Sequence, residues 1–327
     1  MMLTQPPAVE SSTAQQGTRR RLPVAAGLAT RWDQRFTPYA FVAPFFVLFA
    51  VFGLYPLLWT AWISLHHTIL ERVDETGSYV GFQYFAGLWH DEFFWNALRN
   101  TLSIGLLSAV PQLLLALGIA HLLNYRLRGS TFWRVAVLLP FATSIAAATL
   151  VFAQLYNRDY GMVNYVLHHW FGMKNIDFQD RRWPGQIAIA TIIMWRWTGY
   201  NALIYLASMQ SIPSELYEAA AIDGAGRWRQ FRHVTIPALR PTIIFTVIVS
   251  TIGSLQIFGE PYLFAPGNKV SGGPNRDYQT LSMYFYERGF TDQNLGRAAA
   301  IAWAMLLVIL VFVVINALIA RRMKDSE

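Results

Sequence analysis

Two apolar stretches of the sequence carry side chains that could bind a small polar molecule. Hydroxyl and amide groups hydrogen bond with the hydroxyl groups of a solute, while aromatic faces pack against its rings. Ser250 and Ser254 are one helical turn apart and therefore share a helix face. The same residue types also join helices or mark membrane interfaces, so both roles stay open. The candidates for binding are Trp197, Tyr200 and Asn201 in stretch 187–209 and Ser250, Ser254, Gln256 and Glu260 in stretch 243–264.

Two charged residues, Arg196 and Glu260, also lie in these stretches. A charge inside a membrane is costly unless it is paired or hydrated. The two could pair with each other, contact a substrate or sit where water reaches them, and the sequence leaves these roles open. A carrier driven by an ion gradient would bury a carboxylate deep among its helices, and Glu260 is the sole candidate.

The sequence offers little for catalysis. The histidine pairs 66–67 and 168–169 lie at the ends of apolar stretches, where adjacent side chains on a helix point apart. We expect them to be interfacial rather than metal ligands. A P-loop, an H-E-x-x-H motif and a G-x-S-x-G motif are absent from the sequence. The absence of cysteine excludes disulfides and thiolate metal sites. We therefore expect no cofactor bound by this chain and no ATPase site of its own.

The composition is that of a membrane protein. The chain of 327 residues is 54% hydrophobic and 14% charged, with a mean hydropathy of +0.31. Crossing a bilayer takes about 20 apolar residues, which must be helical because lipid cannot hydrogen bond with the backbone. Six stretches fit: 39–65, 102–123, 135–156, 187–209, 243–264 and 298–320. The fold class is thus an all-α integral membrane protein with six transmembrane helices. Kinks or helix ends are expected at Pro44, Pro56, Pro111, Pro140 and Pro261.

The distribution of Lys and Arg predicts the orientation in the membrane. Fifteen Lys and Arg residues lie in the N-terminal arm, loops 124–134 and 210–242 and the C-terminal tail taken together. The other three loops together hold ten. Because cytoplasmic loops are enriched in Lys and Arg, we expect both termini and loop 210–242 to be cytoplasmic. The net charge of +7 then reflects attraction to anionic membrane lipid and implies no nucleic-acid partner.

The N-terminal arm is polar and rich in Ser, Thr, Gln, Pro and Ala, so we expect residues 1–37 to be disordered. Arg19, Arg20 and Arg21 beside the first span are interpreted as a topology signal. A short apolar core with a cleavage site is not evident before this span, which predicts that it is retained as an anchor.

The segment 218–241 reads EAAAIDGAGRWRQFRHVTIPALRP between two apolar runs. Ser214 is predicted to cap a short helix that begins near Glu215. Gly224 can adopt the left-handed conformation that ends this helix. The apolar residues at 228, 231 and 234 then form a stripe on a second short helix, which Pro237 and Pro241 limit. Such a helix–Gly–helix segment is either an ordinary loop or a shaped surface for a soluble partner.

This segment resembles the EAA loop of binding-protein-dependent ABC importer permeases. Its pattern is E-A-A-x-x-D-G-A, five residues, then F-x-x-V-x-I-P-x-x-x-P, with Val and Ile where Ile and Leu are more usual. The resemblance implies that the loop, about 211–241, docks in a cleft of a separate ATPase subunit, which holds ATP and Mg, and couples it to the pore. The residues at family positions are Glu218, Ala219, Ala220, Asp223, Gly224, Ala225, Phe231, Pro237 and Pro241.

A second stretch, 271–300, is similar to the corresponding part of carbohydrate-type ABC permeases. It has a Gly-Gly-Pro turn, a Thr-Leu step, an aromatic helix and a Gly-x-Ala segment, in that order. Met283, Phe285 and Tyr286 are expected on the outer membrane surface. The loop either anchors this surface or also touches an extracytoplasmic binding protein. The matching residues are Gly272, Gly273, Pro274, Thr280, Leu281, Tyr284, Tyr286, Phe290, Gly296, Ala298 and Ala300.

The resemblance covers 38–322 and is greatest to the maltose-transporter-type permease, the first of two different permease subunits. It implies a type I ABC importer permease architecture, with a permease domain at 38–322 and a tail at 323–327. It also implies that positions near Trp197, Tyr200, Ser250 and Ser254 line a sugar site. The extra N-terminal spans and large periplasmic domain of the maltose-type protein are missing, so any contact with a binding protein would use short loops.

The expected function is therefore that of a sugar or oligosaccharide permease in a bacterial-type inner membrane. The expected partners are a second permease, an ABC ATPase dimer and an extracytoplasmic solute-binding protein. Neutral polar and aromatic residues in the spans favour an uncharged sugar, since an anion would require convergent Arg or Lys. The alternatives are a permease for glycerol phosphate or another polar solute and, less favoured, an ion-coupled secondary carrier or an intramembrane enzyme.

Overall fold

The computed structural model describes residues 37, 39–72, 77–125, 128–267 and 269–325. The described residues form helices joined by turns and isolated β-bridges, without a strand, which confirms the all-α fold. The chain divides into two compact units, Met1–Leu58 and Trp59–Glu327. The predicted disorder of the N-terminal arm falls on residues that lie almost entirely outside the described ranges, as does the end of the tail.

The first predicted span is a helix over Tyr39–Ser64. It contains a π-helical turn, η1 (Ala50–Leu54), which is followed directly by α2 (Tyr55–Ser64). Pro56 lacks the N–H that a regular helix would use at this point, so an irregular turn just before it is expected. The prediction of a kink or irregularity at Pro56 agrees with this turn.

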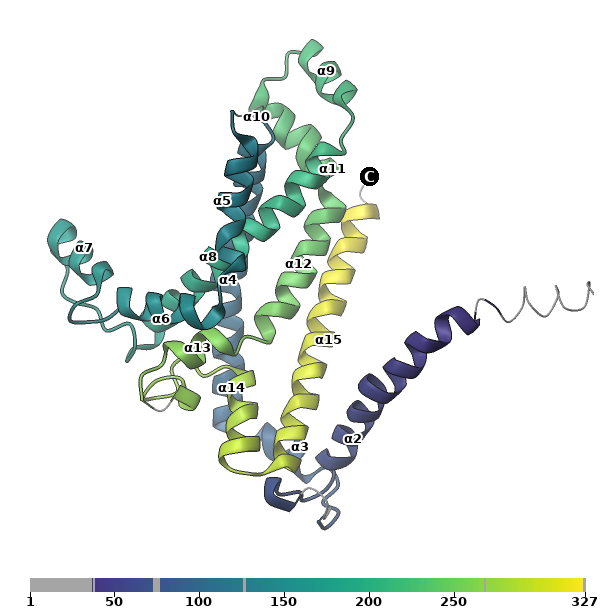
Figure 1. Ribbon diagram of the computed structural model, residues 1–327, viewed down its shortest axis with the longest axis vertical. Helices are drawn as coiled ribbons and strands as arrows, with labels where there is room; N and C mark the ends of the chain where they lie inside the picture. The colour runs from purple at the N-terminus through teal and green to yellow at the C-terminus, as the bar shows by residue number, and fades with distance from the viewer. Residues whose placement is uncertain (1–36, 38, 73–76, 126–127, 268, 326–327) are drawn as a thin grey trace, which may run out of the picture. The chain divides into compact units, whose positions relative to one another are not determined.

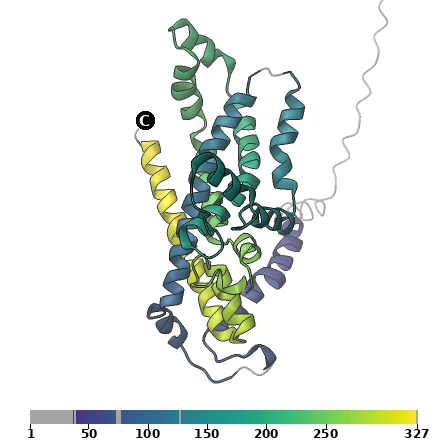
Figure 2. The same ribbon diagram turned by 90° about the vertical axis from the view of Figure 1, so that its left-hand side faces the viewer.

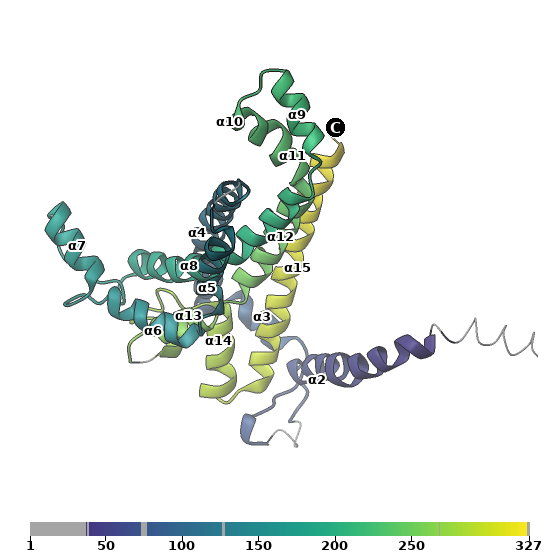
Figure 3. The same ribbon diagram turned by 45° about the horizontal axis from the view of Figure 1, so that its top comes forward.

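The second unit is built around two long helices, α4 (Glu92–Leu123) and α8 (Arg182–Gln210), which pack extensively against each other. Ala116 and Ala120 on α4 and Ala202 on α8 are fully buried where the helices meet. Small side chains let helices approach closely in a membrane, where packing rather than hydrophobicity drives their association. α12 (Arg240–Leu255) and α15 (Leu295–Asp325) run side by side next to this pair (Figure 1 and Figure 3).

Within the described ranges, three helices are long and apolar enough to cross a membrane: Tyr39–Ser64, Glu92–Leu123 and Leu295–Arg321. Two further spans are possible if each of two bent helix pairs counts as one. α8 covers the predicted fourth span, but its polar and charged residues keep it outside this set. Helical structure is thus present at all six predicted stretches, although not always as one straight rod.

The stretches 135–156 and 243–264 are each interrupted, close to the kinks or helix ends expected at Pro140 and Pro261. The first consists of α5 (Ser130–Ala142) and α6 (Ile145–Leu155), which are bent by 89°. The second ends at Leu255, and after a three-residue break α13 (Gly259–Phe264) continues the chain. Pro140 lies near the end of α5, and Pro261 lies in the first turn of α13, whereas α4 runs through Pro111 without a break.

The remaining helices are short, and α7 projects from the side of the second unit (Figure 1). The segment between α8 and α12 lies at one end, and α3 and α14 lie at the other (Figure 1 and Figure 2). Their bounds are η2 Leu70–Arg72, α3 Gln83–Trp89, α7 Met162–Phe171, α9 Ser214–Ile222, α10 Arg227–Gln230, η3 Phe231–Thr235, α11 Ile236–Ala238, η4 Lys269–Ser271, α14 Leu281–Tyr286 and η5 Glu287–Thr291.

The backbone break after α12 is hydrogen bonded from outside its own helix. The hydroxyl of Thr280 donates to the carbonyl of Ile257 at 2.7 Å. The next residue, Leu281, donates its N–H to the hydroxyl of Thr101 on α4 at 2.9 Å. An unpaired carbonyl within lipid would cost several kcal/mol, so this contact makes the break tolerable. A carbonyl freed at a helix end within a membrane needs a hydrogen-bond donor from a neighbouring segment, and Thr280 supplies this donor.

A buried polar cluster fixes the loop before α14 to α4 and α8. The side-chain amide of Asn100 donates to the carbonyls of Arg276 at 2.8 Å and Gln279 at 3.2 Å. Gln186 of α8 donates to Asn100 Oδ1 at 3.0 Å. Burial, reinforced by nearby carboxylates, raises the pKa of the Tyr278 hydroxyl, which therefore stays protonated and donates to the carbonyl of Gln179 at 2.9 Å.

The contact between α5 and α8 depends on Gly199. A Cβ at this position would lie 1.8 Å from the carbonyl oxygen of Val137, so any side chain must push the helices apart. Gly199→Ala should therefore lower the stability of the purified protein by about 2 kcal/mol or more. The matched control is Gly118→Ala on α4, where a Cβ meets no atom within 4 Å. Equal thermal midpoints of the two variants in detergent would contradict this packing.

Candidate functional site

The second unit contains a cavity of about 340 Å³ between α4, α8, α12 and α13. All seven residues that the sequence nominated for binding line it, although they come from three different helical segments and a break. The structure thus brings them together, while their role in binding stays a prediction. They are Trp197, Tyr200, Asn201, Ser250, Ser254, Gln256 and Glu260.

Helical spacing on α12 directs the hydroxyl groups into the cavity. Ser250 and Ser254 are separated by one turn, and Gly253 between them leaves the wall open. A Cβ on Gly105 of α4 would lie 3.0 Å from Ser254 Oγ, so the two helices are in close contact at this level. Gln256 directly follows the last residue of α12. The residues from Gln256 to Glu260, which lead from α12 into α13, all line the cavity.

An aromatic cluster forms the wall on the α8 side. The rings of Phe141 and Tyr200 are stacked with centroids 4.7 Å apart, and Trp197 meets both rings edge to face at 5.1 and 5.8 Å. Phe141 stands near the end of α5 and fixes the orientation of the two cavity residues. Sequence reasoning missed it because the contact depends on how α5 packs on α8.

The cavity also includes residues of α4 that the sequence analysis did not select. Ser108 and Gln112 are almost fully buried and lie one turn apart. These two residues could have been found from the sequence, because two polar side chains at i and i+4 within an apolar run share one helix face and need a partner or a cavity. Ile145 at the start of α6 and Phe258 in the break add apolar wall, and sequence alone gives no sign of their position.

Arg196 and Glu260 pair with each other. Arg196 on α8 donates from a terminal guanidinium nitrogen to Glu260 Oε1 on α13 at 3.0 Å. Their side chains are only 8% and 9% exposed, and both line the cavity. The sequence left three roles open for Arg196 and Glu260, and the structure supports pairing with each other.

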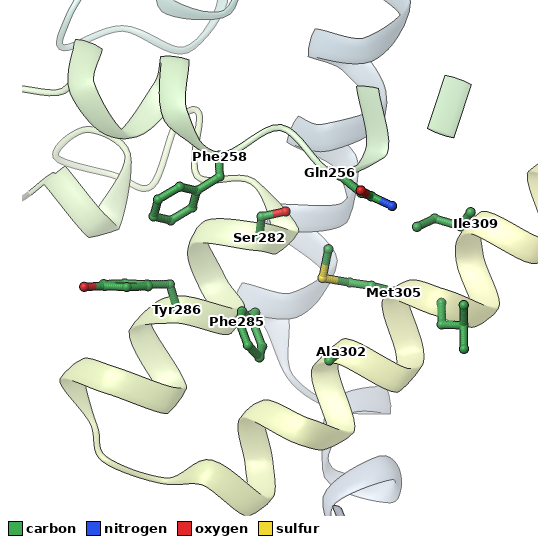
Figure 4. Close-up of a pocket in the computed structure, with 9 residues that line it drawn as sticks. Gln256, Phe258, Ser282, Phe285, Tyr286, Ala302, Met305 and Ile309 are labelled. Atoms are coloured by element: carbon green, nitrogen blue, oxygen red, sulfur yellow. The ribbon is translucent and has the colours of Figure 1, made fainter. Parts of the chain in front are cut away.

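A second groove of about 540 Å³ opens beside the cavity and shares Gln256 and Phe258 with it (Figure 4). Its other walls are α14 and α15, with Phe285, Tyr286 and Met305 facing the space. The expectation that Met283 lies on the outer surface is wrong, because this side chain is fully buried. The α14 helix packs against α4 and α15.

The preceding Gly-Gly-Pro turn has the conformation that its sequence predicts. Gly272 and Gly273 adopt φ values of 65° and 94°. A Cβ on Gly272 would also lie 2.4 Å from the backbone nitrogen of Gln279. Glycine is therefore required at Gly272 for both backbone conformation and close approach.

The predicted coupling loop is a helix–turn–helix at one end of the second unit (Figure 1 and Figure 2). Gly224 has φ of 76°, so the left-handed turn is confirmed. The predicted capping by Ser214 is wrong: Pro213 occupies the N-cap position and Ser214 is already the first helical residue. α9 exposes Glu215 and Glu218 to the surroundings.

The second half of this loop is anchored to the bundle. Phe231 is buried, and its ring centroid lies 4.2 Å from that of His121 on α4. Trp228 is exposed and Val234 is half-buried, so only the middle residue of the predicted stripe, Phe231, is buried. Tyr217 on α9 and Thr235 on η3 are joined by a hydroxyl–hydroxyl bond of 3.0 Å. The remaining predicted coupling residues, Ala219, Ala220, Asp223, Ala225 and Pro237, lie on α9, in the turn and on α11.

Comparison with known proteins agrees with these features. The family described as "Binding-protein-dependent transport system inner membrane component" matches residues 77–325. The lactose transport system permease protein LacF of Rhizobium radiobacter is 35% identical, covering 88% of this chain and 94% of that protein. The arabinooligosaccharides transport system permease protein AraP of Halalkalibacterium halodurans is 31% identical, covering 85% of this chain and 86% of that protein.

The sn-glycerol-3-phosphate transport system permease protein UgpA of Salmonella typhimurium is also 31% identical, covering 86% of this chain and 93% of that protein. Among solved structures, a chain of a bacterial alginate ABC transporter in complex with an alginate pentasaccharide-bound periplasmic protein has a TM-score of 0.75. That match is 24% identical and covers 90% of this chain and 97% of the other. It establishes the likeness of fold, the type I permease architecture.

The turn at Gly224 provides a test of the coupling-loop geometry. Gly224→Val should destabilise the turn by about 1–2 kcal/mol, because a β-branched residue resists a positive φ. Gly224→Asn is the matched control, since asparagine tolerates this conformation. Hydrogen exchange of the α9 amides in the purified chain should be faster in the valine variant than in the asparagine variant. Identical exchange in both would show that the positive φ is not needed.

Proposed function

The chain belongs to the family of binding-protein-dependent transport system inner membrane components, and from this premise we propose that it carries a sugar or oligosaccharide. It is a multi-pass inner-membrane permease subunit of an ABC importer. The observation that supports a sugar is the cavity itself, in which hydroxyl, amide and aromatic side chains from separate helices converge. These groups match the hydroxyl groups and ring faces of a carbohydrate.

The relatives support the same class of substrate. LacF is a lactose permease and AraP an arabinooligosaccharide permease by name. Glycerol 3-phosphate is the second candidate, because UgpA is similar over nearly its whole length. Secondary transport driven by an ion gradient is disfavoured: the cavity carboxylate, Glu260, is held by Arg196 and is not a free proton or ion acceptor.

We further propose the assembly that such a permease requires. This chain and a second permease form the pathway, an ABC ATPase dimer binds ATP and Mg on the cytoplasmic side, and an extracytoplasmic binding protein delivers the sugar. The chain itself then holds no ATP. Both termini and the coupling loop face the cytoplasm in this arrangement, in accord with the distribution of Lys and Arg.

The coupling loop is connected directly to two cavity walls. α8 ends at Gln210 and α12 begins at Arg240, so both flank the loop and both line the cavity. Near the loop, Ser208 bonds with Thr242 at 2.8 Å and Tyr205 with Thr246 at 2.7 Å, which joins the two helices. A displacement of the loop by the ATPase would therefore move α8 and α12 as one body and change the cavity.

Filling the cavity tests the substrate path. Ser250→Trp should reduce ATP-dependent sugar uptake by the reconstituted complex at least about tenfold, because the indole occupies the space that a sugar ring needs. The control is Leu114→Trp on the exposed face of α4, which adds the same group away from the cavity. Radiolabelled lactose is a suitable first substrate. Undiminished uptake by an assembled Ser250→Trp complex would place the path elsewhere.

Reversing a charge on α9 tests the coupling role. Glu218→Arg should reduce co-purification of the ATPase and the ATPase rate stimulated by the loaded binding protein, since an exposed carboxylate on the docking helix becomes cationic. Glu92→Arg, exposed at the start of α4, is the charge-matched control. A stimulated ATPase rate equal to that of the parent in both variants would remove Glu218 from the docking surface.

A further inference from the structure

The charge balance of the cavity rests on a single ion pair. Among the described residues that line it, only Arg196 and Glu260 carry charge. The other polar groups are hydroxyls and amides, such as Ser108, Gln112 and Asn201. A cavity with one cation and one anion in contact has no net charge, so its field falls off rapidly with distance.

The geometry holds the two charges together. The contact of 3.0 Å links α8 to the first turn of α13, just beyond the break that ends α12. Both side chains are more than nine-tenths buried, and Arg196 Nε has no hydrogen-bond partner among the described residues. Removing either partner would leave the other as an uncompensated charge in a poorly solvated wall.

We propose that the Arg196–Glu260 pair determines the charge selectivity of this permease, keeping the cavity neutral so that it accepts uncharged polyhydroxylated solutes and does not attract anions. The inference rests on the proposed function of the cavity as the substrate path. It makes Glu260 a specificity-determining residue: without this carboxylate, Arg196 would turn the same cavity into an anion-attracting site. The glycerol phosphate alternative is correspondingly disfavoured, because the one cavity cation is already neutralised.

The absence of cysteine in this chain allows a direct test. Ser250→Cys places one thiol on the cavity wall, in a complex whose partner subunits lack accessible cysteines. Its reaction rates are measured with three methanethiosulfonates: neutral methyl, anionic ethylsulfonate and cationic ethyltrimethylammonium. The neutral reagent corrects for access and for thiol ionisation. Ser78→Cys, exposed in loop 66–101 and away from the coupling loop, is the reference thiol.

A neutral cavity predicts that the anion-to-cation rate ratio at Ser250→Cys equals that at Ser78→Cys within about twofold. Adding Glu260→Gln should raise this ratio by about threefold or more, and adding Arg196→Gln should lower it by a similar factor. The exchanged pair, Arg196→Glu with Glu260→Arg, should restore the original ratio. If the single variants do not assemble, the two thiols compared in the background that retains Arg196 and Glu260 still test the proposal.

The charge inference is overturned if the parental ratio is biased more than threefold in either direction, or if both single variants leave it unchanged. These results would leave the substrate path itself intact, because the thiol still reacts with the neutral reagent. If the neutral reagent fails to label Ser250→Cys both with and without a bound ATP analogue, the cavity is closed to water. That result would contradict the proposed function as well.

Discussion

The structure of the cavity depends on one constraint: a helix cannot be interrupted inside an apolar region unless other groups hydrogen bond with the freed backbone. The chain ends α12 at Leu255 and restarts as α13 at Gly259. Thr280, which precedes α14, donates to the carbonyl of Ile257 in this gap. This hydrogen bond lets the backbone turn, and the turn brings Gln256 and Glu260 onto the same cavity as Ser250 and Ser254.

The break also links the two ends of the second unit. On one side, Leu281 after Thr280 is bonded to Thr101, and the preceding loop is held by Asn100. On the other side, α12 leads back to the coupling loop, whose Phe231 packs against His121 of the same α4. Binding at one end and ATPase action at the other would therefore act on a common set of helices, with the cavity between them.

Part of this arrangement was predictable from the sequence, and the reasons are specific. Polar side chains such as Ser254 and Asn201 are conspicuous within apolar runs because each needs a partner or a cavity. Gly224 was identifiable because few other residues accept its positive φ. By contrast, hydropathy reports length and polarity but not direction, so the 89° angle between α5 and α6 could not be predicted, although Pro140 indicated an interruption there. The bond between Thr280 and Ile257 and the stacking of Phe141 on Tyr200 depend on tertiary packing, which no local pattern encodes.

The central claim is that the cavity between α4, α8, α12 and α13 is the sugar path of an ATP-driven importer. The most direct measurement is a cryo-electron microscopy structure of the assembled complex, with the loaded binding protein, trapped with an ATP analogue. The account predicts sugar density within hydrogen-bonding distance of Ser250 or Ser254 and against the rings of Trp197 or Tyr200. Sugar density at another site within the membrane, with this cavity filled by side chains, would contradict it.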